Sequence, residues 1–151
     1  MPDRTTRVLA AVLFVVFGTI PPAMADPLVA FRVTDGGIAQ PLTAQPGDPV
    51  HGRALVADPD HGGCLSCHAA PMPEEDFQGQ VGPNLAGVGD RLGPAQLRLR
   101  LIDPKRINPT TVMPAFYRTE GLHRVAKAFE GKPILTAQEI EDVVAYLVSL
   151  H

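Results

Sequence analysis

The segment Cys64-Leu65-Ser66-Cys67-His68 contains both cysteines of this 151-residue chain. Gly62 and Gly63 precede it, and prolines follow up to Pro73, so we expect a loop or a single tight turn here. Two cysteines are too few for a disulfide-rich scaffold. The chemistry of this one pair therefore has to be explained on its own.

Cys-x-x-Cys followed directly by His is the signature of covalent haem attachment. Two intervening residues let both sulfurs reach the vinyl groups on one porphyrin edge, and the adjacent histidine can then lie under the iron. We predict that Cys64 and Cys67 bind one haem c covalently and that His68 is an axial iron ligand. The alternatives are a disulfide, a thioredoxin-like redox pair, which needs a βαβ context that is lacking here, and a zinc site, which needs further ligands at regular spacing.

The second axial ligand has to come from elsewhere in the chain. Met113 lies in a proline-bounded loop over residues 108–116, which can hold a thioether against the iron, and we predict that it is this ligand. Met72 follows His68 by only four residues and has almost no slack to reach the other haem face, so we expect a surface or edge methionine. His123 is the reserve ligand. A His/Met pair raises the reduction potential relative to two histidines, which suits a one-electron carrier.

Gly82-Pro83-Asn84-Leu85 follows His68 on the loop expected to pass the histidine side of the haem. Metal-bound histidines usually donate a hydrogen bond from their second ring nitrogen. We predict that the Pro83 carbonyl accepts this bond from His68. The simpler interpretation is that Gly82-Pro83 merely forms a turn.

The N-terminus has the features of an export signal. Arg4 and Arg7 precede an apolar stretch from Val8 to Ile20, and Ala23-Met24-Ala25 matches a small-x-small cleavage site. The apolar stretch is shorter than the roughly 20 residues that span a bilayer, which argues against a permanent membrane anchor. We predict a signal peptide over residues 1–25, a periplasmic location, an extension over 26–47 and one domain over 48–151.

Charge is spread unevenly along the chain, whose formal net charge is -3. This balance gives no basic surplus for a nucleic-acid partner. Nine acidic residues lie within 26–90, whereas nine basic residues lie within 91–132. These are either solvated helix faces or surfaces for electrostatic docking, and Arg98, Arg100 and Arg106 are the docking candidates.

The clearest predicted helix covers residues 136–150. Thr136 and Glu139 form a capping box, and an apolar face with a helical period follows, which leaves Glu141 and Asp142 on the outside. Other capping, proline and glycine signals predict the following elements: a short strand or hairpin around Asp35-Gly36-Gly37, a helix over 50–57 capped by Asp48-Pro49, a helix from Gly93-Pro94 to Asp103-Pro104, and a helix over 120–129. The chain is therefore mainly α-helical with long loops, and a large apolar cofactor would explain those loops.

Taken together, the Cys-x-x-Cys-His site, the Gly-Pro-x-Leu loop, the Met-Pro loop and the C-terminal amphipathic helix resemble class I cytochrome c over about residues 48–151. A closer resemblance is to the SoxX family, the small monohaem subunits of SoxAX sulfur-oxidation cytochromes. It is carried by the segments 63–68, 108–117, 131–136 and 141–147.

The SoxX resemblance implies a periplasmic heterodimer with a SoxA-like cytochrome. That complex couples thiosulfate oxidatively to a cysteine of the SoxYZ carrier protein. The resemblance assigns the sulfur chemistry to the partner haem, while the SoxX haem accepts electrons and passes them to a soluble c-type cytochrome. Both cysteines of this chain are used by haem attachment, so we expect no catalysis by the chain alone. Two alternatives stay open, a free-standing electron carrier and a ligand-binding haem protein with an open iron face.

Overall fold

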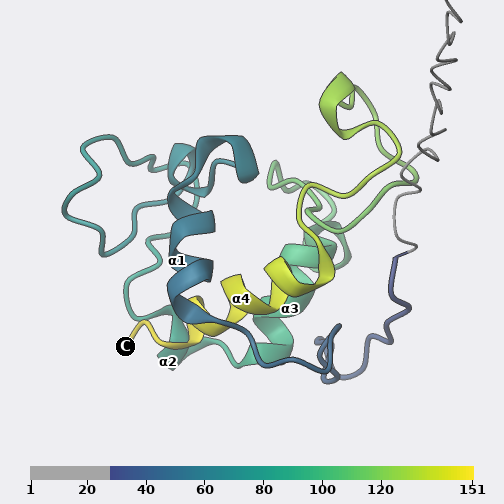
Figure 1. Cartoon of the computed structure of the whole chain (residues 1–151), viewed down its shortest axis with the longest axis horizontal. Helices are drawn as coiled ribbons and strands as arrows, with labels where there is room; N and C mark the ends of the chain where they lie inside the picture. The colour runs from purple at the N-terminus through teal and green to yellow at the C-terminus, as the bar shows by residue number, and fades with distance from the viewer. Residues whose placement is uncertain (1–27) are drawn as a thin grey trace, which may run out of the picture.

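Four α-helices joined by long loops form the computed structural model, which describes residues 28–151 (Figure 1). Their bounds are α1 Pro49–Ala57, α2 Val88–Arg91, α3 Pro94–Ile102 and α4 Ala137–Val148. Single 3-10 turns lie at Pro59–His61, Cys64–Ser66, Pro104–Arg106 and Lys127–Phe129. The predicted signal peptide falls outside the described residues. Within residues 28–151 no helix is both long and apolar enough to span a membrane.

The predicted helix starts at Asp48 and Thr136 are confirmed. The Asp48 carboxylate accepts a hydrogen bond from the Val50 N–H at 2.8 Å, and Pro49 occupies the first turn of α1. At the start of α4, Thr136 Oγ1 accepts from the Glu139 N–H at 3.3 Å, and Glu139 Oε2 accepts from the Thr136 N–H at 2.7 Å. This is the reciprocal capping box that the sequence predicts.

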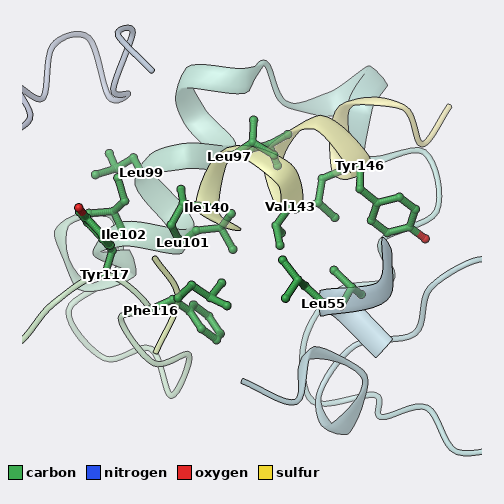
Figure 2. Close-up of a cluster of buried hydrophobic side chains, with 14 of the residues drawn as sticks. Leu55, Leu97, Leu99, Leu101, Ile102, Phe116, Tyr117, Ile140, Val143 and Tyr146 are labelled. Carbon is green, nitrogen blue, oxygen red and sulfur yellow. The ribbon is translucent and has the colours of Figure 1, made fainter. Parts of the chain in front are cut away.

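Helices α1 and α4 cross at very close range. A Cβ atom added to Gly52 in α1 would overlap the carbonyl of Asp142 in α4, so only glycine allows this approach. Figure 2 shows Leu55 of α1 and Val143 of α4 pointing toward one another in the core. The crossing therefore forms one side of the apolar cluster.

Helix α3 and the loop that follows it complete this cluster. Leu97, Leu101 and Ile140 are buried where α3 packs on α4, and Phe116 lies next to Leu101 and Ile140 (Figure 2). The Phe116 N–H donates to the Leu101 carbonyl at 2.9 Å, and the Phe116 carbonyl accepts from the Leu135 N–H at 3.0 Å. Backbone bonds thus attach the long loop between α3 and α4 to the core.

The prediction that Glu141 and Asp142 lie on the outside of α4 is wrong, because both are buried. The segment 38–47 and helix α1 cover the side of α4 that the helical period assigns to solvent. Glu141 accepts from the Leu42 N–H at 2.9 Å, and Asp142 accepts from the Asp48 N–H at 2.8 Å. Both carboxylates therefore satisfy backbone donors of the N-terminal extension and the α1 cap.

Arg98 is also buried, so it lies neither on a solvated helix face nor on a docking surface, which are the two alternatives that the sequence leaves open. Its guanidinium forms a bidentate pair with Glu141, Nε to Oε1 and Nη2 to Oε2, both at 2.7 Å. Its Nη1 donates to the Ile38 carbonyl at 2.6 Å. One ion pair therefore joins α3, α4 and the N-terminal extension.

Two further expectations differ from the structure. The helix predicted over 120–129 is wrong, since only the turn Lys127–Phe129 forms there. Gly121 and Arg124 have φ values of 65° and 58°, which a right-handed helix does not allow.

The predicted strand or hairpin is reduced to one bridge between Thr34 and Gly37, and no strand forms in the described part of the chain. The segment before the bridge packs apolar side chains against the hydrophobic core instead.

Candidate haem-binding site

The segment 64–68 is a single tight turn, as the glycine pattern predicts. Cys64 to Ser66 form a 3-10 turn, and the Cys64 carbonyl accepts from the N–H groups of Cys67 and His68 at 3.1 and 2.9 Å. The turn begins at Gly63, whose φ of 57° lies in the left-handed region. Two sulfurs and an imidazole therefore come from one rigid turn, and no disulfide joins Cys64 to Cys67.

Burial raises the pKa of the Cys64 thiol to about 11. A thioredoxin-like pair requires a cysteine with a lowered pKa, because the thiolate is the nucleophile. The environment of Cys64 therefore disfavours the redox-pair alternative.

The orientation of His68 is fixed from the loop that contains Pro83. His68 Nδ1 lies 2.7 Å from the Pro83 carbonyl oxygen. A carbonyl only accepts, so Nδ1 carries the proton and Nε2 keeps its lone pair. This is the predicted contact, and it leaves the imidazole in the form that binds iron.

The loop reaches His68 closely because residue 82 is glycine. The Gly82 N–H donates to the Cys67 carbonyl at 2.8 Å, and a Cβ atom at this position would overlap the His68 ring. The donor set, the tautomer and this cradle all fit a haem held by Cys64, Cys67 and His68. The assignment of His68 as axial ligand stays a prediction.

Met113 lies in a loop that is held on both sides. Its side chain is partly buried and packs against the core cluster. Lys105 Nζ donates to the Thr111 carbonyl at 2.8 Å before it, and Phe116 is bonded to α3 after it. The loop therefore has the rigidity expected of a ligand loop, and the role of Met113 stays a prediction.

The expectation that Met72 is a surface or edge residue is wrong, since this side chain is fully buried. Gln78 folds the chain back over it: its Nε2 donates to the Met72 carbonyl at 2.8 Å, and its Oε1 accepts from the Ala70 N–H at 2.7 Å. Met72 fills the core, as methionine often does. The reserve ligand His123 is exposed on irregular backbone.

Asp142 and His51 form a second polar cluster that sequence reasoning missed. His51 Nδ1 lies 2.7 Å from Asp142 Oδ2, and Gln138 Nε2 donates to Oδ1 at 2.9 Å. The hydrogen bond to Asp142 raises the pKa of His51. Burial acts to raise the pKa of Asp142, but the bonds from His51, Asp48 and Gln138 outweigh it and lower that pKa. No local sequence signal links residues so far apart in the chain.

Comparisons with known proteins agree with this site. The chain matches the family model described as "Cytochrome c" over residues 50–151. Among solved structures it is similar to a chain of "Crystal structure of SoxXA from P. pantotrophus", with 39% sequence identity and a TM-score of 0.73. That match covers 80% of this chain and 93% of the solved chain. A search of curated proteins gave no match.

The family match covers the turn at Cys64, the Pro83 loop, the Met113 loop and α4 in one continuous segment. The helical architecture is that of class I cytochrome c, as predicted. The Cys-x-x-Cys turn within that match accounts for one covalently bound haem c. The chain belongs to the cytochrome c family, in which it is a SoxX-type electron-transfer protein.

Proposed function

We propose that this chain is the electron-accepting subunit of a periplasmic SoxAX complex. In that complex a SoxA-like cytochrome couples thiosulfate oxidatively to a cysteine of a SoxYZ carrier. The observation that carries the proposal is the 39% identity, over 80% of this chain, to a chain of the SoxXA crystal structure. The coverage of 93% of the solved chain supports a similar overall construction.

The residues of the chain support electron transfer and not sulfur chemistry. Cys64 and Cys67 are the only cysteines, and haem attachment uses both, so no thiol remains as a nucleophile or persulfide carrier. A bound haem supplies a one-electron ferric/ferrous couple. In the proposed roles, His68 and Met113 are the axial ligands, and the Pro83 carbonyl holds the His68 tautomer.

The proposed route has two partners for electrons. Electrons released by the coupling of thiosulfate to SoxYZ enter this chain from the SoxA-like subunit, and they leave to a soluble c-type cytochrome. An N-terminal signal peptide delivers the chain to the periplasm. The complex is the thiosulfotransferase, and this chain has no catalytic residue of its own.

Purification of the tagged protein from its native periplasm tests this proposal. Haem absorbance and mass spectrometry then identify what elutes with it. A stoichiometric SoxA-like cytochrome is the expected result. A lone monomer with full haem content would contradict the proposal and support a free-standing class I electron carrier.

A further inference from the structure

Residues 73–81 form a loop that presents a large apolar side chain to solvent. Phe77 is 91% exposed, and Val81 in the same loop is 71% exposed. Three carboxylates, Glu74, Glu75 and Asp76, precede Phe77 directly. The loop lies in the segment that leaves the haem-attachment turn and projects from the helices (Figure 1). Aromatic side chains are enriched in protein interfaces, whereas charged side chains are depleted at the interface core and the rim is polar.

The loop is anchored on both sides of Phe77, so its exposure does not come from a lack of contacts. On one side, Glu74 forms an ion pair with Arg53 of α1. On the other, Gln78 bonds to the backbone of Ala70 and Met72, and the Gly79 N–H donates to the Leu65 carbonyl at 2.7 Å. The phenyl ring is therefore presented on ordered backbone, which lowers the entropy cost of docking.

A surface pocket of about 560 Å³ lies beside Phe77 and reaches the haem-attachment turn. One wall comes from the loop and the other from the end of α1 and the turn itself: its lining includes Glu75, Asp76, Phe77, Ala57, Leu65 and Ser66. Cys64 and Cys67 flank Leu65 and Ser66, and their sulfurs are the atoms that bind the porphyrin edge. A protein docked on this surface would therefore contact the turn whose cysteines would hold the haem.

The negative charge of the loop 73–81 favours a partner with a positively charged surface. Arg53 compensates Glu74, but Glu75 and Asp76 have no ion pair within the described residues. Two uncompensated carboxylates attract a positive surface and steer its approach. The apolar part is small, which is typical of weak, transient electron-transfer contacts and not of a permanent subunit interface.

We propose that residues 73–81, together with the adjacent pocket, dock a transient redox protein whose apolar hollow is rimmed by Lys and Arg. Phe77 enters that hollow, and Glu75 and Asp76 pair with the basic rim. One electron leaves the haem of this chain and reduces the partner by one electron, with no atom or proton transferred. This rests on the proposed function, because it assigns the exit to the soluble acceptor.

Stopped-flow kinetics of the reduced holoprotein test the docking surface directly. The probe is a ferric, lysine-rich soluble c-type cytochrome, and an acidic blue-copper protein in its oxidised Cu(II) form is the control probe of opposite charge. Glu75→Gln combined with Asp76→Asn is expected to lower the second-order rate with the basic probe about three- to tenfold at low salt. This difference disappears at about 1 M salt, where charges are screened over about 3 Å.

Phe77→Ser is expected to weaken binding of the basic probe about tenfold or more, and the loss persists at high salt because the contact is apolar. Val50→Ala, at an apolar position on α1 that is 77% exposed, is the matched control and leaves the rate unchanged. Glu120→Gln combined with Glu130→Gln is the control for charge, because it also removes two carboxylates but at positions outside residues 73–81. Thermal unfolding of each variant establishes that the fold is intact.

Equal rates for the wild type, the Glu75/Asp76 variant and Phe77→Ser would overturn the docking proposal, whatever elutes with the protein. Loss of a co-purifying SoxA-like subunit from Phe77→Ser would also overturn it, because the loop would then be a permanent interface. Self-association that Phe77→Ser abolishes would assign the loop to a second copy of this chain and so contradict it. The absence of a SoxA-like subunit, with the kinetic differences intact, would reject the proposed complex and leave this docking surface supported.

Discussion

The buried pair of Arg98 and Glu141 gives the sharpest test of how this fold is held together. Arg98→Met keeps most of the side-chain volume but removes the guanidinium. Glu141 is only 5% exposed, so its carboxylate then stays buried without its charged partner. Breaking a buried ion pair by removing one partner costs about 3–5 kcal/mol. The Ile38 carbonyl also loses its donor, at 2.6 Å in the wild type, which adds to that cost.

Thermal unfolding of the holoprotein, followed by helical circular dichroism, measures this cost. For a domain of this size we expect the Tm to fall by about 10–20 °C, from a shift of about 3–5 °C per kcal/mol. Arg100→Met is the matched control on the same helix, since among residues 28–151 the side chain of this arginine bonds only to the Gln96 carbonyl, at 3.1 Å. It is expected to change stability by no more than about 0.5 kcal/mol.

A double variant separates charge from packing. Arg98→Met combined with Glu141→Leu removes both charges and is expected to regain a large part of the loss, because apolar replacements of buried ion pairs are often tolerated. Recovery is incomplete, since the Leu42 N–H loses the acceptor that Glu141 supplies at 2.9 Å. If Arg98→Met is no less stable than Arg100→Met, the reasoning about this pair is refuted.

Three further predictions concern the site and the second polar cluster. Met113→Ala is expected to lower the reduction potential, abolish the sulfur-to-iron charge-transfer band and let the ferrous protein bind carbon monoxide. The control Met72→Ala is expected to keep the band and to lose about 2–5 kcal/mol of stability, because it truncates a buried methionine. Visible spectra and redox titration measure these changes, and the opposite pattern would assign the ligand to Met72. Gly82→Ala is expected to displace the His68 ring and lower the yield of holoprotein, as measured by haem staining against total protein; normal yield and an unchanged spectrum would contradict the close packing. For His51→Asn, the loss of stability is expected in the pH window between the lowered pKa of Asp142 and the raised pKa of His51. The stability that His51 contributes is complete below its unfolded pKa of 6.5 and is lost as pH rises through its folded pKa. The stability that Asp142 contributes is present above its unfolded pKa of 3.8 and is lost as pH falls through its folded pKa. Unfolding curves measured from acid to alkaline pH would contradict this if the variant and the wild type differed equally at every pH.

Local signals in the sequence were sufficient wherever the interacting residues are neighbours in the chain. The Asp48 cap and the Thr136–Glu139 capping box each join residues within three positions, so side-chain chemistry alone sets them. The tight turn at 64–68 follows from its glycines and prolines in the same way. The Pro83 contact to His68 spans 15 residues, and it was predictable because a metal-bound histidine needs an acceptor.

Only the tertiary structure decided which polar side chains are buried. The helical period places Glu141 on the solvent side of α4, but the N-terminal extension covers that side and Arg98, 43 residues away, pairs with it. Met72 is buried because Gln78 folds the loop back, and the helix over 120–129 is lost to left-handed backbone at Gly121 and Arg124. Burial depends on which segments pack together, and a periodic pattern within one segment contains no information about the others. The sequence by itself therefore determined the haem chemistry and the helix caps, while packing between distant segments determined the core and its ion pairs.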